Sequence, residues 1–185
     1  MRVGELTAVL VLFIVMSLPT AAGADTARAG KFAISPMLGG FYWDPDTHLG
    51  NGPEYGIGAA YYFTENFGAE LMFNFADPGT DSGFNNGDIN LYLVHLDAVY
   101  HFRSIWKLEP YVAAGAGMAW REQYLGGEDP RHFTTLATLN AGGGIEYPIS
   151  DRVALRGDLR YMATIGDFNY NNFMYIVGIT YYIGN

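Results

Sequence analysis

The sequence of 185 residues contains no cysteine. Disulfide bonds, thiolate metal sites and a cysteine nucleophile are therefore excluded. Basic residues are scarce, because 10 lysines and arginines stand against 19 acidic residues and give a formal net charge of −9 at pH 7. Nucleic acids are bound by basic surfaces, so we expect no nucleic-acid partner.

Helical patterns and long apolar runs are missing from most of the chain. Beyond residue 24 no window shows sustained helical periodicity, and the mean hydropathy of +0.06 excludes a bundle of membrane helices. Aromatic residues make up 16%, and the 24 glycines are about twice the usual share of ~7%. Apolar residues reach 50%, which is too many for an intrinsically disordered chain. This composition favours strands and tight turns.

The first segment has the layout of a secretory signal peptide. Arg2 precedes an apolar run of 13 residues, Leu6–Leu18, and Ala22-Gly23-Ala24 forms a cleavage site of small residues. The run is too short for a transmembrane helix, which needs about 20 residues. We therefore predict a cleaved signal peptide over residues 1–24 and an exported domain over residues 25–185.

The exported part divides into runs in which apolar positions alternate with small or polar ones, which is the pattern of strands. Eight such runs are expected to be strands: Phe32–Tyr42, Tyr55–Phe63, Phe67–Phe75, Ile89–Phe102, Tyr111–Arg121, Thr134–Tyr147, Val153–Ile165 and Phe173–Ile183.

The direction in which the apolar faces point decides the class of barrel. A soluble, lipocalin-like carrier turns them inward, whereas a membrane barrel turns them toward lipid. The polar faces carry small residues such as Gly115 and Gly117, which a crowded interior needs. The apolar faces end in aromatic residues such as Tyr42, Phe67 and Tyr181, which are typical of the two lipid–water interfaces. Both features favour the membrane barrel.

The connections between the runs alternate in length. Short connections are expected at residues 64–66, 103–110 and 150–152. Long, glycine-rich and mostly acidic connections are expected at residues 43–54, 76–88, 122–133 and 166–172. This alternation is typical of an all-β, eight-stranded antiparallel up-and-down transmembrane β-barrel with all of its long loops at one end.

Two segments carry a family resemblance: residues 110–117, which read PYVAAGAG, and the last run with Gly178, Tyr181 and Ile183. With the strand layout, they resemble the small eight-stranded outer-membrane barrels of Gram-negative bacteria, such as the OmpA transmembrane domain, OmpX and Ail, and the opacity-type surface antigens. The resemblance implies export through the periplasm to the cell outer membrane, with membrane lipids and lipopolysaccharide as partners. It also implies that Gly178, Tyr181 and Ile183 form the signal for the barrel-assembly machinery, although the chain ends in Gly184-Asn185 rather than in an aromatic residue.

Alternation along the strands predicts a network of charged side chains inside the barrel. Its members are Glu70, His95, Asp97, Arg121, Glu146, Arg156, Asp158 and Arg160. A three-residue turn at 150–152 would pair Ile149 with Val153 and place Glu146 opposite Arg156. The network is interpreted either as a plug of salt bridges or as an ion path, and the narrow interior of eight strands favours the plug.

Catalytic and metal-binding residues are weakly supported. Similar barrels that modify lipid A need a nucleophile or an acid–base group beside the outer leaflet, whereas the nearest His–Ser pair, His101 and Ser104, falls at the opposite end. His48 and His132 are interpreted as ordinary loop residues. The acidic loops either hold divalent cations or form a solvated surface, and the latter is favoured. We expect no enzyme, no cofactor and no dedicated metal site.

The expected function is that of a structural, surface-exposed barrel that supports envelope integrity or presents its loops to the outside. The alternatives are a lipid A-modifying enzyme, a small-solute pore and a soluble periplasmic carrier. The sequence names no ligand for the loops.

Overall fold

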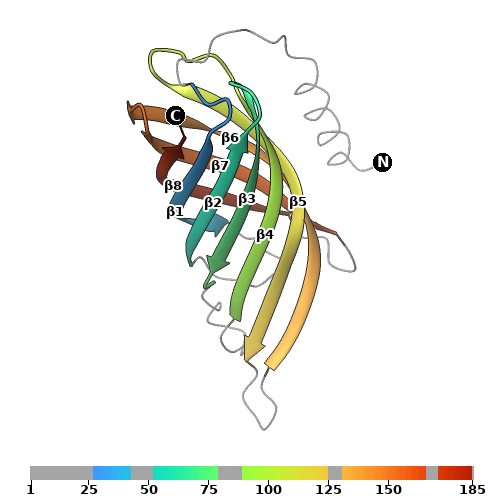
Figure 1. Cartoon of the computed structure of the whole chain (residues 1–185). Coiled ribbons are helices and arrows are strands. Elements are labelled where there is room, and N and C mark those ends of the chain that lie inside the picture. Colours follow the sequence, from blue (N-terminus) through green and yellow to red (C-terminus); the bar gives the residue numbers. More distant parts are fainter. Residues whose placement is uncertain (1–26, 43–51, 79–88, 125–130, 166–170, 185) are drawn as a thin grey trace.

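Eight antiparallel strands form one closed barrel in the computed structural model, which describes residues 27–42, 52–78, 89–124, 131–165 and 171–184 (Figure 1). Each strand pairs with its neighbours in sequence, and β1 pairs with β8 to close the barrel. The strands are β1 (Phe32–Tyr42), β2 (Pro53–Tyr62), β3 (Phe67–Ala76), β4 (Ile89–His101), β5 (Glu109–Tyr124), β6 (Arg131–Ser150), β7 (Val153–Ile165) and β8 (Asn171–Ile183). No helix in this described part is long and apolar enough to span a membrane.

The predicted barrel is confirmed, and the strand bounds differ mainly in β5 and β6. These two strands are 16 and 20 residues long and remain paired as far as Tyr124 and Arg131. Their ends were expected to be loop because polar residues interrupt the apolar alternation there. Backbone hydrogen bonds between neighbouring strands do not need that alternation, so the sheet continues beyond the apolar belt.

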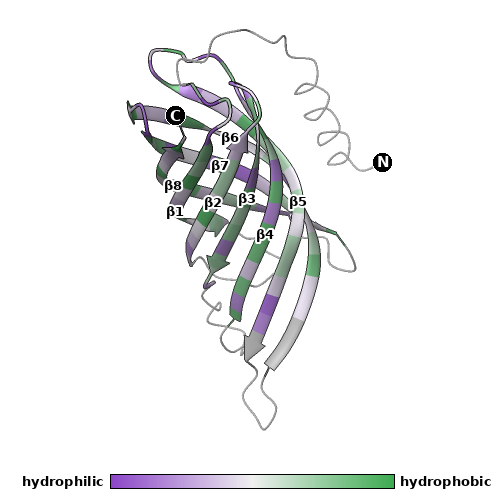
Figure 2. Ribbon diagram, viewed as in Figure 1, coloured by the Kyte–Doolittle hydropathy of each residue, from purple (hydrophilic) through white to green (hydrophobic). Residues whose placement is uncertain are grey.

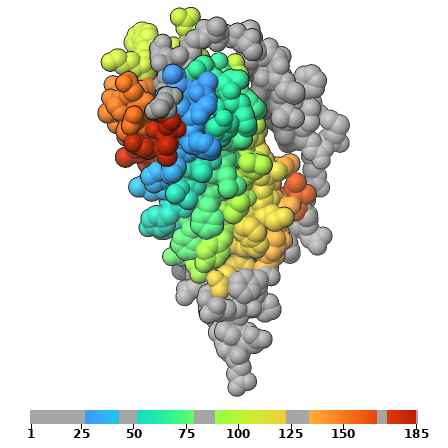
Figure 3. Space-filling view, viewed as in Figure 1, coloured from blue at the N-terminus to red at the C-terminus, as the bar shows by residue number. Residues whose placement is uncertain are grey.

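The two faces of the barrel wall differ in polarity as the membrane arrangement requires. Apolar side chains such as Leu38, Leu71 and Leu155 are exposed on the outer face, whereas Glu70 and Asp97 are buried inside. Hydrophobic and hydrophilic bands accordingly alternate along the strands (Figure 2). On the face seen in Figure 3, the side chains of β1 to β5 form a continuous wall. An exposed apolar belt around a polar interior is the reverse of a soluble carrier.

Both ends of the described chain lie at the same end of the barrel as the short turns (Figure 1). The turns there join β2 to β3, β4 to β5 and β6 to β7. The connections at the opposite end lie largely outside the described residues, as do residues 1–26 with the predicted signal peptide. In a membrane barrel of this layout the end with the short turns faces the periplasm.

The turn between β6 and β7 corrects one prediction. Ser150 pairs directly with Val153, so Asp151 and Arg152 form a two-residue turn and Ile149 does not pair with Val153. A bulge between Pro148 and Ser150 inserts one residue into β6. This insertion compensates for the shorter turn, and beyond it the expected register holds.

Beyond the bulge, Glu146 lies opposite Arg156, Gly144 opposite Asp158 and Gly142 opposite Arg160. The two glycines leave room beside long charged side chains that point into the barrel.

The packing predicts that alanine is tolerated at one glycine of the barrel wall but not at another. A Cβ atom on Gly115 would overlap the carbonyl oxygen of Leu96 and the side chain of Asp97, whereas one on Gly157 would meet no atom within 4 Å. We expect Gly115→Ala to lower the free energy of unfolding by about 1–3 kcal/mol, because the backbone must shift. Gly157→Ala is the matched control and should change it by less than about 0.5 kcal/mol. Urea unfolding in detergent micelles measures both, and equal midpoints for the two variants would contradict this packing.

Candidate functional site

The middle of the barrel interior holds a network of five charged side chains, here called the central network: Glu70 of β3, Asp97 of β4, and Arg156, Asp158 and Arg160 of β7. Each is at most 6% exposed. The three residues of β7 alternate along the strand, so all three side chains point inward. Glu70 and Asp97 are direct neighbours across the β3–β4 pair.

The two arginines of the central network link the opposite walls of the barrel. Arg156 binds Glu70 through two nitrogens, with N–O distances of 2.5 and 2.8 Å, and Asp158 at 2.8 Å. Arg160 binds Asp97, Glu70 at 3.1 Å and Asp158 at 3.1 Å. Paired, charge-assisted hydrogen bonds of this kind are the strong ones in proteins.

Neutral groups complete the central network. The Asn140 side-chain amide donates to Asp97 at 2.7 Å, and Arg156 Nε donates to the Tyr111 hydroxyl at 2.8 Å. The Arg156 guanidinium also lies 5.1 Å from the centre of the Tyr111 ring. His95 is hydrogen-bonded to Thr138 beside the network, with an N–O distance of 3.1 Å.

A second set of contacts, the entry network, lies where the chain enters the barrel. Arg28 precedes β1, is fully buried, and forms ion pairs with Glu109 and with Glu146, the latter at 3.2 Å. Its Nε atom donates to the Tyr182 hydroxyl at 3.0 Å, and its backbone N–H donates to Glu65 at 2.6 Å. Arg28 thereby connects β5, β6, β8 and the β2–β3 turn.

The charge of Arg28 is secured by its surroundings. Burial by itself lowers the pKa of the guanidinium, but Tyr182, Glu146 and Glu109 act in the opposite direction and raise the pKa well above its ordinary value. Arg28 therefore remains a cation at any physiological pH.

Hydrogen bonds also hold the glutamate that faces Arg28. Glu146 accepts from Thr180 at 3.0 Å and from Tyr182 at 2.5 Å, and Ser35 donates to Thr180 at 3.0 Å. Because Ser35 lies on β1 and Thr180 on β8, the bond between them crosses the seam that closes the barrel.

The structure places Glu146 and Arg156 opposite each other, yet their ion pairs go elsewhere. Arg156 binds Glu70 and Asp158, and Glu146 binds Arg28. The ion pair between Glu146 and Arg156 that the hairpin register suggested is therefore not formed. The reason is that an arginine side chain reaches across the interior, so its partner is set by the opposite wall as much as by the neighbouring strand.

Arg28 and Glu109 were missed because both lie outside the predicted strands. A count of the predicted interior charges could have indicated a missing cation, because the set holds four acids but only three arginines. One of these arginines, Arg121, lies half-buried near the loop end of β5. The remaining acids needed a further cation.

The part of the interior nearest the long loops contains a buried apolar cluster, whereas the sequence predicted only polar side chains inside the barrel. A buried cluster there is rich in methionine and aliphatic residues: Met37, Phe41, Met72, Ala76, Ile89, Leu91, Leu93, Ala119, Met162, Met174 and Ile176. The ion pairs of the central and entry networks lie in the middle and on the periplasmic side of the barrel.

One acid is buried toward the loop end without an ion pair to any described residue. Glu54, expected in a loop, is the second residue of β2 and accepts a hydrogen bond from the Asn74 amide at 2.5 Å. The other carboxyl oxygen of Glu54 and the amide oxygen of Asn74 have no hydrogen-bond partner among the described residues. Within the same residues no group of three or more histidine or acidic side chains is arranged to hold a metal ion.

Comparison with known proteins now identifies the class of this barrel. The sequence model of the outer membrane protein beta-barrel domain matches residues 8–182. The chain belongs to this family. Its exposed apolar belt therefore faces the lipids of an outer membrane.

Solved structures show the same fold at low sequence identity. Neisserial surface protein A (NspA) matches with a TM-score of 0.67 and 18% identity, over 83% of this chain and 97% of that protein. Ail of Yersinia pestis matches with a TM-score of 0.57 and 16% identity, over 84% of this chain and 99% of that protein. The N-terminal β-barrel domain of Pseudomonas aeruginosa OprF matches with a TM-score of 0.56 and 20% identity, over 84% of this chain and 98% of that domain. No curated protein matches the sequence significantly.

The residues of the expected assembly signal lie on β8. Tyr181 and Ile183 are exposed on the lipid-facing side, and Gly178 lies between Met37 of β1 and Arg156 of β7. Their recognition by the barrel-assembly machinery remains a prediction.

The entry network predicts unequal effects for its two kinds of charge. In Arg28→Gln two buried carboxylates face each other without their cation, and we expect the free energy of unfolding to fall by about 3–5 kcal/mol. In Glu109→Gln the Arg28–Glu146 pair remains balanced, so the loss should be clearly smaller. Denaturant unfolding in micelles, read out by the heat-dependent gel mobility of the barrel, compares the two variants. Equal losses for the two variants would contradict unpaired buried carboxylates as the cause of the destabilisation.

Proposed function

We propose that this protein is a structural, surface-exposed barrel of the Gram-negative outer membrane, with an interior closed by ion pairs and with no enzymatic activity. It supports the integrity of the envelope or presents its loops to external partners. The observation that carries this proposal is the central network, which connects the β3–β4 wall with β7 through the middle of the interior.

The central network is better suited to a plug than to an ion path. An eight-stranded interior is just wide enough for side chains to fill it. Charged groups that line an aqueous path are solvated, whereas these five side chains are buried and bind one another. The apolar cluster on the loop side supports the same conclusion, because it is a barrier to ions.

The described histidines support a non-enzymatic role. His95 and His101 are buried inside the barrel, where they bind Thr138 and Tyr62. An acid–base group that acts on lipid A has to reach the outer leaflet. His48 and His132, which belong to the loop end, lie outside the described side chains.

We infer the partners from the apolar belt and from the end of β8. The apolar belt meets outer-membrane lipids and lipopolysaccharide, and the end of β8 with Gly178, Tyr181 and Ile183 meets the barrel-assembly machinery. One similar structure is that of Ail in complex with a heparin analogue, sucrose octasulfate. The long loops of this chain are acidic, so we do not expect a polyanion as their ligand.

The plug predicts that removal of one arginine weakens the whole barrel. In Arg156→Met, Glu70 loses its two-bond partner and Arg160 alone faces three acids. We expect a loss of about 3–5 kcal/mol in the free energy of unfolding in detergent. Arg152→Met, in the exposed β6–β7 turn, is the control and should change it by less than about 0.5 kcal/mol. An unchanged unfolding midpoint for Arg156→Met would refute the plug.

The proposed function itself is tested by two expected negative results and one positive one. The purified barrel should give no steady conductance in planar bilayers, and overexpression should leave the acylation of lipid A unchanged. Deletion of its gene should make the cells more sensitive to detergents or remove binding of an external partner. Steady ion conductance would favour the small-solute pore, and altered lipid A would favour the enzyme.

A further inference from the structure

The turn between β4 and β5 has an unusual tip. Ile105 and Leu108 are paired by two backbone hydrogen bonds, with N–O distances of 2.7 and 3.0 Å. The two residues between them, Trp106 and Lys107, have φ angles of 56° and 74°. Successive positive φ angles define a turn in which Asn-Gly is the usual pair, because larger side chains are disfavoured there.

This backbone presents apolar side chains to the surroundings. Trp106 is 95% exposed, Ile105 is 62% exposed and Leu108 is 40% exposed. At this exposure the Trp106 ring buries almost no surface against the described part of the barrel. Its exposure instead suits a surface that the tip contacts.

The tip is joined to the lipid-facing surface. Tyr100 lies on the outer face of β4 next to Phe67 of β3, and its ring centre is 5.2 Å from that of Phe102. From Phe102 the chain runs directly into the turn with Ile105 and Trp106. Aromatic side chains therefore extend from the membrane belt toward the tip.

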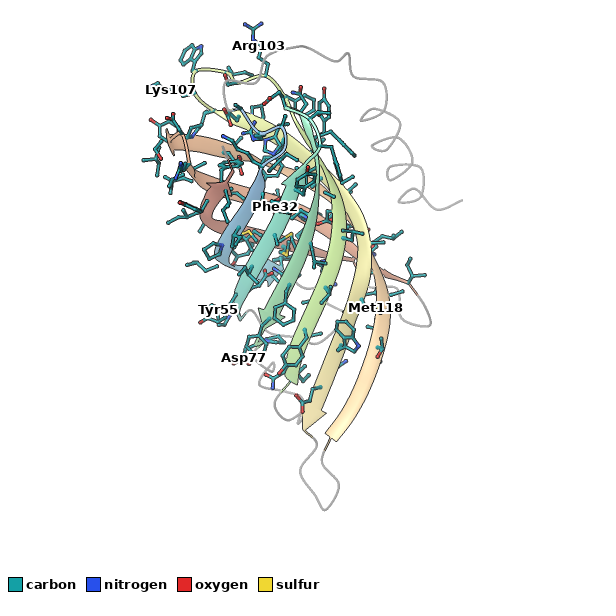
Figure 4. All side chains as sticks on the ribbon, in the orientation of Figure 1. Phe32, Tyr55, Asp77, Arg103, Lys107 and Met118 are labelled. Atoms are coloured by element: carbon teal, nitrogen blue, oxygen red, sulfur yellow. The ribbon has the colours of Figure 1, made fainter. Side chains whose placement is uncertain are left out.

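Basic side chains accompany the apolar ones. Arg103 and Lys107 are exposed on the turn (Figure 4). Beside it, a recess of about 530 Å³ is lined by Lys31 and Lys107 together with the β6–β7 turn. The carboxyl groups on its wall are those of Asp151 and of Glu109, which binds Arg28.

We propose that the β4–β5 tip and the adjoining recess bind anionic phospholipid in the inner leaflet of the outer membrane. Trp106, Ile105 and Leu108 enter the interfacial region, while Arg103, Lys107 and Lys31 contact lipid phosphate groups. Tryptophan prefers the lipid–water interface, and lysine and arginine next to it are attracted by anionic lipid. The rings of Tyr100, on the outer face, and of Phe102, from which the chain enters the turn, favour lipid over a ligand in the periplasmic space.

Tryptophan fluorescence tests the proposal, because the sequence has only three tryptophans. Trp43→Phe with Trp120→Phe leaves Trp106 as the only tryptophan. We would reconstitute this variant in vesicles of phosphatidylethanolamine and phosphatidylglycerol, and in vesicles of phosphatidylcholine. In the anionic vesicles we expect blue-shifted emission, quenching by lipid brominated near the headgroup and a severalfold loss of quenching by iodide.

The matched control keeps Trp120 instead, through Trp43→Phe with Trp106→Phe. Trp120 lies next to Tyr92 on the outer face of the barrel, so brominated lipid should quench it equally in both kinds of vesicle. Lys31→Gln with Lys107→Gln should remove the preference of Trp106 for anionic vesicles and leave the heat-dependent gel mobility unchanged. Should a double tryptophan variant fail to fold, the difference between the native protein and Trp106→Phe gives the same readout.

Full iodide access to Trp106 in anionic vesicles, without quenching by brominated lipid, would overturn the proposal. Protection of Trp106 only after addition of soluble peptidoglycan fragments would also overturn it and would assign the tip to the cell wall.

Discussion

The interior of an eight-stranded barrel has room for side chains but little room for a hydration shell, so each inward charge needs an opposite charge or a hydrogen bond. Arg156 and Arg160 meet this constraint in the middle of the barrel, where they bind acids from both walls. Arg28 meets it at the entry, where it binds Glu109 and Glu146. Because these contacts span strands far apart in sequence, the charge balance of the interior also holds the barrel closed.

The residues just before β1 help to hold the barrel together through the entry network. Arg28 reaches acids on β5 and β6, and the Lys31 carbonyl accepts a hydrogen bond from the Tyr62 amide of β2. Nearby, Ser35 and Thr180 bind across the β1–β8 seam. The segment before β1 is thus part of the interior packing, and the seam is reinforced by side chains as well as by the backbone ladder.

The two ends of the barrel differ in charge and in interior packing. Basic side chains such as Arg103, Lys107 and Arg152 lie at the short turns, whereas the sequence of the long loops is mostly acidic. Inside, ion pairs occupy the middle and the periplasmic side, and a cluster of methionines and aliphatic residues lies on the loop side. This polarity suits a molecule whose two ends meet different surroundings.

The barrel could be predicted from the amino-acid sequence alone, because strand alternation, turn lengths and small inward residues are local properties. The bounds of β1 and β7, the side of the wall on which Glu70 and Asp97 lie, and the register of Glu146 with Arg156 all follow from the period of two. The local pattern gave wrong strand ends for β5 and β6, because backbone pairing continues there without apolar alternation. It also gave a wrong turn length between β6 and β7, where a bulge at Ile149 replaces the longer turn. Three sets of contacts became visible only in the folded barrel. Arg156 binds Glu70, Arg28 is buried against Glu109 and Glu146, and Glu54 pairs with Asn74. Long side chains find their partners across the closed interior, and the distances across it depend on how all eight strands tilt and close together.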